Sequence, residues 1–314
     1  MEILLVGTGY MANEYAKVLI AQNVKFDVVG RSEINCNKFR ETFGVNVFSG
    51  GLESLKIKKK YTHAIIASSL EYLSQHTAQL INVGIRSILV EKPGALSIDD
   101  LHKLNIQANL NSASVFVAYN RRFYSSVSKL RELINIEGGI SSIHFEFTEW
   151  VHTIDVKDYS EISLQKWILS NSSHVIDIVF FLLGEIKELN SNVSKKEGIS
   201  WHPSGSIFTG AGQSKNGVPF SYHSNWESAG RWSIEILTKE NRYYLRPIEK
   251  LQVQKKGTLG IELVEIDNLL DEKYKPGVFN QVKYFLKDNM ENFCSLNQQL
   301  INASLYSQIA NYSV

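Results

Sequence analysis

The chain has 314 residues, of which 44% are hydrophobic and 21% charged, and its formal net charge is +1 at pH 7. This length fits two domains with a well-buried core. Because there is neither a basic excess nor an acidic tail, we expect no nucleic-acid partner. The KIKKK run at 56–60 is the one dense basic cluster; we interpret it as a solvated surface loop, with phosphate binding as the alternative.

The compartment is predicted from the N-terminus and the cysteines. The opening MEILLVGTGYMA has an apolar stretch too short for a signal peptide, and it runs directly into glycines. No segment reaches the length of a membrane span. Cys36 and Cys294 lie far apart with no CxxC or Cys/His pattern, which predicts neither a disulfide framework nor a zinc site. We therefore expect a cytoplasmic protein with no membrane association and no metal.

Short apolar stretches alternate with amphipathic ones over the first 120 residues. The expected strands and helices, in chain order, are EILLVG (2–7), YMANEYAKVLIAQ (10–22), KFDVVG (25–30), a polar helix near 35–43, HAIIAS (63–68), EYLSQHTAQLINVG (71–84), SILVEK (87–92), IDDLHKLNIQANLN (98–111) and SVFVAY (114–119). This alternation predicts an α/β fold with a doubly wound parallel sheet and right-handed crossovers.

The pattern changes after about residue 125. SIHFEFTEW (142–150) alternates with period two, and a long apolar helix is predicted over 170–184. The strand-like stretches that follow are GSIFTGAG (205–212), VPFSYHSNW (218–226), WSIEILTK (232–239), RYYLRPI (242–248) and EKLQVQKK (249–256). Helices are expected at about 278–292 and 296–311. Consecutive strands without helices between them predict an α+β domain with a mainly antiparallel sheet.

We place the domain boundary after residue 122. Residues 1–122 are expected to bind a dinucleotide, and residues 123–314 to bind substrate and to form oligomer contacts. The C-terminal helices are candidates for packing back on the first domain.

The segment GTGYMA fits G-x-G-x-x-G/A and lies directly between the first strand and the first helix. Gly7 permits a tight turn, Gly9 lets the backbone approach a pyrophosphate, and Ala12 keeps the helix close to the sheet. The helix that starts at Tyr10 and Met11 supplies N–H groups and a favourable dipole. This context predicts dinucleotide binding; the alternative is a glycine turn without a ligand.

The end of the second strand indicates which dinucleotide binds. NAD enzymes usually place an acidic residue here for the ribose 2′-hydroxyl, whereas this chain reads VVGRS. Arg31 and Ser32 could hold a 2′-phosphate through charge-assisted hydrogen bonds. NADP(H) is therefore favoured and NAD(H) is the alternative, in which Arg31 is only a solvated surface cation.

The strand SILVEKP brings Glu91 and Lys92 to the carboxyl edge of the sheet, where ligands of such folds bind. A lysine there can donate a hydrogen bond to a substrate hydroxyl or carbonyl. If it is partly desolvated, it can also exchange protons near neutral pH. The sequence leaves open whether a cis peptide precedes Pro93.

Taken together, these motifs resemble the glucose–fructose oxidoreductase / inositol dehydrogenase (Gfo/Idh/MocA) family. The resemblance rests on GTGYMA at 7–12, ASS at 67–69 with His76 downstream, EKPGALS at 91–97, AYNRRF at 118–123 and HVIDIVFFLLG at 174–184. It implies an N-terminal Rossmann domain and a C-terminal domain with a large open sheet. It also implies reversible hydride transfer between nicotinamide and a sugar, cyclitol or related alcohol or carbonyl.

The resemblance assigns roles by position. Lys92 matches the lysine that contacts the reacting oxygen and the nicotinamide ribose, and His174 the histidine usually proposed as acid/base. Asn120 and Arg121 match residues on the substrate side, and Asp177 a carboxylate that often binds substrate hydroxyls. The residues that complete the expected cofactor site are Ser68, Ser69, His76 and Glu91.

Two positions depart from the family pattern. Ser170 stands where an Asp is common, four residues before His174, and Ser68-Ser69 replaces a common Thr-Pro. At helical spacing, Ser170, Asn171, His174 and Asp177 share one face, which we predict to bind substrate. The alternative is that these polar groups only hydrogen-bond to neighbouring backbone or to each other.

The leading functional hypothesis is an NADP(H)-dependent oxidoreductase of a sugar or sugar-like substrate such as a cyclitol or nucleotide sugar, assembled as a homo-oligomer (dimer or tetramer). The alternatives are a reductase of a non-sugar carbonyl and a catalytically impaired NADP(H)-binding sensor, which the serine at 170 would favour. Several polar aromatics could stack on a sugar, although most are expected in the core or in interfaces. They are Tyr124, Trp150, His152, Tyr159, Trp201, His202 and Trp226.

Overall fold

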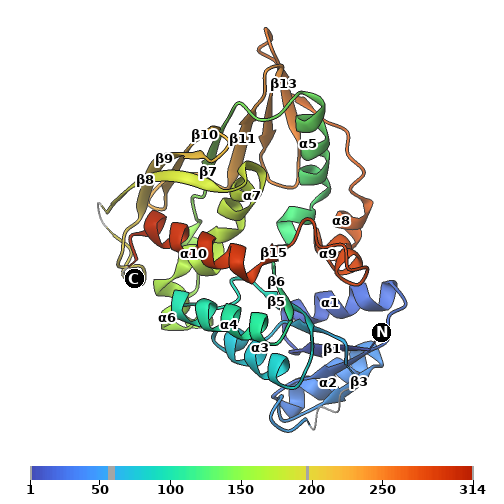
Figure 1. The fold of residues 1–314 in the computed structure, drawn as a ribbon. Coiled ribbons are helices and arrows are strands. Elements are labelled where there is room, and N and C mark those ends of the chain that lie inside the picture. Colours follow the sequence, from blue (N-terminus) through green and yellow to red (C-terminus); the bar gives the residue numbers. More distant parts are fainter. Residues whose placement is uncertain (1, 56–60, 196–197, 313–314) are drawn as a thin grey trace. The chain divides into compact units, whose positions relative to one another are not determined.

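The computed structural model describes residues 2–55, 61–195 and 198–312, so the KIKKK run at 56–60 lies outside the described residues. The chain divides into two compact units (Figure 1). Unit 1 comprises Met1–Asn120 and Leu270–Ile301, and unit 2 comprises Arg121–Leu269 and Asn302–Val314.

Unit 1 is built on a seven-stranded sheet with the strand order β15-β6-β5-β4-β1-β2-β3. Its strands are β1 Ile3–Val6, β2 Phe26–Val29, β3 Asn46–Phe48, β4 His63–Ile66, β5 Ser87–Glu91, β6 Ser114–Ala118 and β15 Cys294–Ser295. Every pair is parallel except β15 with β6. The predicted doubly wound Rossmann sheet is confirmed, and the strand order reverses between β1 and β4, where such folds bind ligands.

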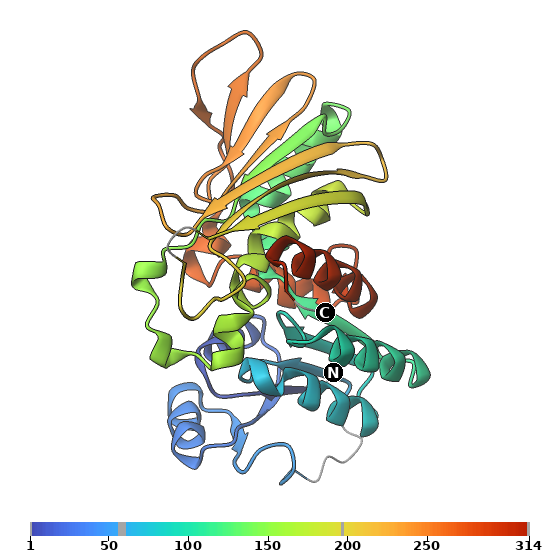
Figure 2. The ribbon, with the colours of Figure 1, turned by 90° about the vertical axis from the view of Figure 1, so that its left-hand side faces the viewer.

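The helices of unit 1 cover both faces of this sheet. They are α1 Tyr10–Ala21, α2 Glu33–Phe43, α3 Leu73–Asn82, α4 Ile98–Leu110, α8 Leu269–Lys273 and α9 Val278–Phe285, with a 3₁₀ turn at Leu70–Tyr72. A further 3₁₀ turn, Asn120–Phe123, begins at the last residue of this part of unit 1 and continues into unit 2. α1 and α2 lie on one side and α3 and α4 on the other (Figure 2). Strands β1 and β4 are buried along their whole length, which explains their continuous apolar sequence.

The helix predicted over 278–292 is wrong in its second half. α9 ends at Phe285, and Asp288 has a left-handed φ of 53°. The Asn289 N–H returns to the Tyr284 carbonyl, which closes the helix end. The chain then forms β15, an edge strand antiparallel to β6. The polar KDN sequence at 287–289 was the available stop signal.

Unit 2 is built on an eight-stranded sheet with the order β14-β13-β12-β11-β7-β10-β9-β8. The strands are β7 Ser142–Glu146, β8 Ile186–Ser194, β9 Ile207–Ser214, β10 Pro219–Asn225, β11 Ser233–Leu237, β12 Asn241–Leu245, β13 Gln252–Lys255 and β14 Glu262–Leu263. Only β10 and β7 pair in parallel among these described strands. The predicted large, mainly antiparallel sheet is confirmed.

Helices α5 and α7 run along one face of this sheet (Figure 1). The helical segments are α5 Ser125–Ile136, α6 Glu161–Gln165, α7 Ser173–Leu183 and α10 Leu296–Ala310, with 3₁₀ turns at Val151–Thr153 and Val156–Asp158 and a π-helical turn at Ile168–Ser172. Phe180 of α7 packs edge-on against Phe220 of β10, with 6.2 Å between ring centroids. Both rings are buried, and each stabilises the core by about 1.5–3 kcal/mol.

His202 belongs to the core of unit 2 and not to a sugar-stacking surface. Its side chain has no exposed area, with Nδ1 2.7 Å from the Gly205 carbonyl and Nε2 2.8 Å from the Tyr312 hydroxyl. Trp226 is also buried, with 4.7 Å between its ring centroid and that of His202. Burial lowers the pKa of His202 to about 4.

This lowered pKa predicts acid sensitivity of unit 2. Between about pH 6.5, where an unfolded histidine titrates, and about pH 4, the unfolded chain binds a proton that the folded His202 does not. The free energy of unfolding should therefore fall by up to about 1.4 kcal/mol per pH unit as the pH drops through this window. All 5 tryptophans lie in unit 2, so their fluorescence during urea unfolding reports it. His202→Gln should flatten the slope; an unchanged slope would contradict the assignment.

Candidate active site

A pocket of about 320 Å³ lies in unit 1 at the carboxyl ends of β1, β2 and β4. This volume is at the lower end of the range for small-molecule sites. The residues of the predicted cofactor site that line it are Gly7, Gly9, Arg31, Ser32, Ser68, Ser69 and His76. Residues from three separate βα loops therefore meet here, as the strand reversal requires.

Several lining residues were missed by sequence reasoning. They are Thr8, Asn35, Gly50, Gly51, Leu52, Glu53, Tyr72, Gln75 and Gln79. The Gly-Gly pair directly after the third strand was the available signal, since consecutive glycines after a strand often mark a close backbone approach. Both have positive φ, 91° at Gly50 and 77° at Gly51.

The glycine loop leaves room for a phosphate group. Gly7 has a φ of 119°, and a Cβ there would lie 2.4 Å from the Ala67 carbonyl oxygen, so only glycine fits. A Cβ at Gly9 would meet no atom within 4 Å, so the space beside it is open. No side chain caps α1 at Gly9, and the first helical N–H groups have no intrahelical acceptor. This cradle fits the pyrophosphate of a dinucleotide.

A stack of three side chains flanks the pocket. The Arg31 guanidinium lies 5.0 Å from the centroid of the Tyr72 ring, and His76 stacks on the same ring at 5.8 Å. The His76 Nδ1 lies 2.9 Å from the Ser68 hydroxyl oxygen. Burial, reinforced by the charge of Arg31, lowers the pKa of His76. The imidazole is therefore neutral at pH 7, and Arg31 provides the positive charge.

The other predicted cofactor residues lie outside the lining of this pocket. Ala12 is fully buried, which lets α1 pack closely on the sheet, and Met11 is half-buried. Tyr10 is 68% exposed, with the Lys275 ammonium 5.1 Å from its ring centroid.

Ser32, which lines the pocket, accepts a hydrogen bond from the Asn35 N–H and so caps α2, while its own proton can still be donated.

Lys92 follows the last residue of β5 and is half-buried. Glu91 before it is buried and accepts a hydrogen bond of 2.7 Å from the Tyr15 hydroxyl. Burial raises the pKa of Glu91, while the Tyr15 hydrogen bond and the charge of Lys92 oppose this rise. The Lys92–Pro93 peptide bond is cis.

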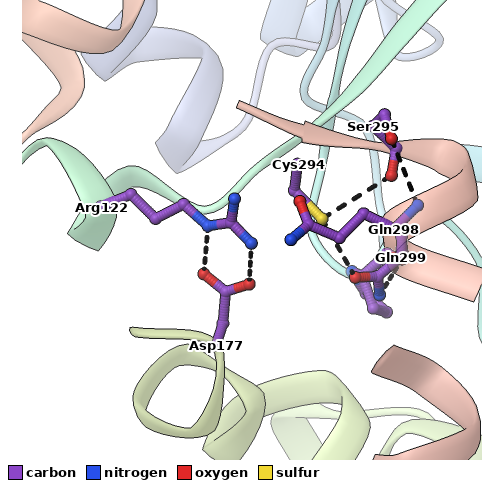
Figure 3. A network of polar contacts seen from close by, with 7 residues as sticks. Arg122, Asp177, Cys294, Ser295, Gln298 and Gln299 are labelled. Carbon is purple, nitrogen blue, oxygen red and sulfur yellow. Dashed lines mark hydrogen bonds and ion pairs between the residues drawn. The ribbon is translucent and has the colours of Figure 1, made fainter. Parts of the chain in front are cut away.

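The turn after Lys92 is held from the other side by residues near the C-terminus. The Gln299 amide donates to the Pro93 carbonyl at 3.0 Å, and the buried Cys294 thiol donates to the Gln299 side-chain oxygen at 3.7 Å (Figure 3). Cys294 thus contributes to packing around this turn. Together with the Tyr15–Glu91 contact, these bonds fix the backbone on both sides of Lys92.

Asn120 does not present a free amide in unit 1. It is 4% exposed, and its side-chain nitrogen donates to the Pro276 carbonyl at 2.9 Å. The Asn120 side chain therefore has a backbone partner within unit 1, and its contact with substrate stays a prediction. The family motif did not reveal this partner because it lies 156 residues away along the chain.

In unit 2, a π-helical turn over Ile168–Ser172 precedes α7. The predicted helix over 170–184 is therefore corrected in its first turn, which is π-helical, and α7 begins at Ser173. Ser170 is buried and donates to the Ser163 carbonyl at 2.8 Å. Its role as a substrate ligand stays a prediction.

A buried carboxylate that sequence reasoning missed lies beside this turn. Glu149, three residues after the end of β7, accepts from the Ser172 hydroxyl at 2.6 Å and from the Asn171 amide at 3.0 Å. Its other oxygen lies 3.4 Å from the Arg231 guanidinium. Burial raises the pKa of Glu149, while these three partners favour its charged form. Asn171 thus helps to hold Glu149, and its contact with substrate stays a prediction.

Asp177 is fully buried and forms a bidentate pair with Arg122 (Figure 3). Its two oxygens accept from Nη2 at 2.6 Å and from Nε at 2.8 Å. Burial raises the pKa of Asp177, while Arg122 opposes the rise. The Asp177 carboxylate therefore pairs with a buried arginine, and its binding of substrate hydroxyls stays a prediction.

His174 and Arg121 lie against one tryptophan of unit 2. His174 is 9% exposed, and its ring centroid is 6.3 Å from that of Trp232. The Arg121 guanidinium lies 4.8 Å from the Trp232 ring centroid and 5.8 Å from that of Tyr124. Unit 2 therefore brings together His174 and Arg121, two of the predicted site residues.

The described residues contain no helix long and apolar enough to cross a membrane. Within the same residues, no group of three or more His, Cys, Asp or Glu side chains could hold a metal ion. Of the predicted sugar-stacking aromatics, Trp150 and Tyr159 are exposed at 48% and 44%, and His152 is exposed as well.

Comparison with known proteins assigns the first unit. Residues 1–119 match the model of the oxidoreductase family with an NAD-binding Rossmann fold (GFO_IDH_MocA). A curated relative, the 1-carboxy-3-chloro-3,4-dihydroxycyclohexa-1,5-diene dehydrogenase of Comamonas testosteroni, is 22% identical over 167 residues. That alignment covers 52% of this chain and 42% of the relative, so the chain matches less than half of the relative's length.

Solved structures share the fold of the whole chain. An oxidoreductase from Agrobacterium radiobacter, in complex with NAD+, L-tartaric acid and magnesium, is 15% identical with a TM-score of 0.81, covering 100% of this chain and 97% of that one. A levoglucosan dehydrogenase in complex with NADH is 17% identical with a TM-score of 0.80, covering 99% and 96%. The match of residues 1–119 is to the Gfo/Idh/MocA oxidoreductase family that the motifs resemble, and the solved structures extend the likeness of fold to the rest of the chain.

Proposed function

We propose that this protein is an NADP(H)-dependent oxidoreductase that interconverts an alcohol and a carbonyl on a sugar or sugar-like molecule. The pocket at Gly7, Gly9 and Arg31 carries the proposal, because it combines a phosphate cradle with a cation where NAD enzymes usually place a carboxylate. Unit 1 is proposed as the cofactor domain and unit 2 as the substrate domain. We also propose a cytoplasmic location and a homo-oligomeric assembly.

The proposed chemistry assigns one task to each of two side chains. When bound, the nicotinamide supplies the hydride acceptor or donor. Lys92, held by the Glu91 and Pro93 contacts on either side, donates a hydrogen bond to the reacting oxygen. His174 removes the hydroxyl proton in oxidation and returns it in reduction, the general-base and general-acid roles that one imidazole can fill.

The substrate class is supported by the relatives. The Comamonas dehydrogenase is named for a dihydroxylated ring that bears a carboxyl group, and levoglucosan is an anhydrosugar. Both are polyhydroxylated rings whose carbinol carbons can lose a hydride. The non-sugar reductase and the impaired sensor remain rivals. The retained Lys92 and His174 argue against the sensor, since a non-catalytic protein needs neither side chain.

A scan of cofactor absorbance tests this function. Sugars, cyclitols, sugar acids and nucleotide sugars are mixed with NADP+ or, in oxidised form, with NADPH, and the nicotinamide absorbance is followed. We expect turnover with at least one polyol ring and a higher kcat/KM with NADP(H) than with NAD(H). Binding of NADP without turnover of any compound would support the sensor instead.

Arg31→Ala should weaken NADP+ binding by roughly tenfold to a hundredfold, because a charge-assisted hydrogen bond to the 2′-phosphate is lost. The affinity for NAD+ should change less than about threefold, since NAD+ lacks that phosphate. Calorimetric titration of both cofactors measures the two constants. Lys38→Ala, which removes an exposed cation of α2 outside the pocket, is the matched control. Tighter binding of NAD+ than NADP+ by the unmodified protein would refute the assignment of Arg31.

A further inference from the structure

Unit 2 carries a ladder of stacked arginines and tryptophans that the proposed hydride transfer does not use. The Arg231 guanidinium lies 4.6 Å from the Trp150 ring centroid and 4.8 Å from that of Trp232. Arg121 lies 4.8 Å from the same Trp232 ring. We call these four residues the arginine–tryptophan cluster. Such stacking holds each guanidinium plane in a fixed orientation.

The cluster forms where several elements of unit 2 end. Trp150 follows β7, and Trp232 directly precedes β11, the strand that pairs with β7 in antiparallel register. Arg121 lies in the 3₁₀ turn at Asn120–Phe123. His174 lies in the first turn of α7, with its ring 6.3 Å from Trp232. The two cations therefore flank the tryptophan that contacts the proposed acid/base.

The buried polar atoms of this cluster that lack a hydrogen-bond partner are hydrogen-bond donors. The Nε of Arg121 and the Nε1 of Trp232 are buried and have no hydrogen-bond partner among the described residues. Buried donors without acceptors are costly, and they are commonly satisfied by a ligand or an ordered water. Because both are N–H groups, an occupant must offer acceptor atoms.

The charge balance of the cluster is positive. Glu149 is the one acidic partner of Arg231 among the described ion pairs, at 3.4 Å, which is long for a charge-assisted bond. Its other oxygen already accepts from Ser172 and Asn171. Arg121 has no acidic partner in the same set of ion pairs. The two guanidinium groups therefore have one carboxylate partner between them, Glu149 on Arg231, and a second anion would balance their charge.

We propose that the substrate of this enzyme carries an oxyanion, a carboxylate or a phosphate, that Arg121 and Arg231 bind beside His174. Arginine forks match the planar geometry of a carboxylate and the oxygens of a phosphate. This inference rests on the proposed function, because it places the anionic group on the molecule that His174 deprotonates. It narrows the substrate from polyols in general to acidic or phosphorylated ones.

Matched sugar triplets test this inference. Glucose, glucuronate and glucose 6-phosphate, and the corresponding galactose series, differ only at carbon 6. Each is titrated calorimetrically into the protein saturated with NADP+. In at least one series, we expect an acidic member to bind between roughly tenfold and a hundredfold more tightly than the neutral sugar. The preferred acidic member identifies carboxylate or phosphate as the oxyanion, and its advantage should shrink at high salt.

Arg231→Gln should remove most of this advantage, and Arg231→Lys should keep part of it, because the charge remains but the planar fork is lost. Arg242→Gln is the matched control. The Arg242 side chain is 44% exposed against 43% for Arg231, and it also pairs with a glutamate, Glu235. It also stacks on a ring, 5.5 Å from the Tyr244 centroid. The control should leave the ratio of acidic to neutral affinity unchanged.

The outcomes separate this inference from the proposed function. The inference would be overturned if neutral and acidic sugars bound with equal affinity, or if no acidic member bound. It would also be overturned if Arg231→Gln left the ratio of acidic to neutral affinity unchanged. Each of these results counts against it even if neutral sugars are turned over. Arg231-dependent binding of the acidic member without any cofactor turnover would sustain the anion site and refute the oxidoreductase assignment.

Discussion

Replacing Arg122 with methionine is expected to lower the free energy of unfolding of unit 2 by about 3–5 kcal/mol. Arg122 is 2% exposed, and its Nε and Nη2 donate to the fully buried carboxylate of Asp177. Removing the guanidinium leaves that carboxylate without its cation, in a place where water cannot replace it. Urea unfolding followed by tryptophan fluorescence measures the loss, because every tryptophan is in unit 2.

The double variant Arg122→Met/Asp177→Leu provides the control. Removing both charges eliminates the uncompensated carboxylate, so most of the lost stability should return. A single variant as stable as the unmodified protein would show that the pair does not hold the 3₁₀ turn at Asn120–Phe123 and α7 together. A double variant that is no better than the single one would show that packing around Arg122, including its contact with Phe181 at 4.7 Å, is the larger effect.

Lys92→Ala and His174→Ala are each expected to lower kcat/KM by about a hundredfold to ten-thousandfold, the usual contribution of a positioned proton-transfer group. Neither change should alter the melting temperature by more than a few degrees, since Lys92 is half-buried and His174 lies at the start of α7. Rates are measured by nicotinamide absorbance with the best substrate of the scan.

The two variants also differ in a way that only catalytic roles explain. His174→Ala should flatten the pH profile of kcat/KM, whereas Lys92→Ala should preserve its histidine limb. His102→Ala and Lys103→Ala, at exposed positions of α4, are the matched controls and should retain full activity. Full turnover by Lys92→Ala or by His174→Ala would remove that residue from the mechanism.

Most of the fold could be predicted because its determinants are local. Alternating apolar strands and amphipathic helices fixed the Rossmann sheet, and period-two strands indicated the second sheet. The errors occurred where a few polar residues override the pattern. The KDN turn ends α9 early, and the serines before α7 form a π-helical turn instead of α-helix.

In the candidate site, too, the features with local determinants could be predicted and those that depend on distant residues could not. The phosphate cradle is encoded in one contiguous motif, so Gly7 and Gly9 could be placed from the sequence alone. The partners of Asp177 and Asn171 could not, because Arg122 and Glu149 lie 55 and 22 residues away along the chain. A polar stripe on a buried helix predicts that partners exist, and only the tertiary structure shows whether they are protein or substrate.

Isotope transfer tests the central claim most directly. The protein is incubated with NADPH deuterated at carbon 4 of the nicotinamide ring, together with oxidised sugars, cyclitols and sugar acids, and the products are analysed by mass spectrometry. We predict one deuterium bound to the carbinol carbon of a product. Less deuterium should be transferred when NADH deuterated at the same carbon replaces the deuterated NADPH. The His174→Ala variant should transfer none over the same time. Loss of the label to water, or retention of all label in the cofactor, would contradict the account.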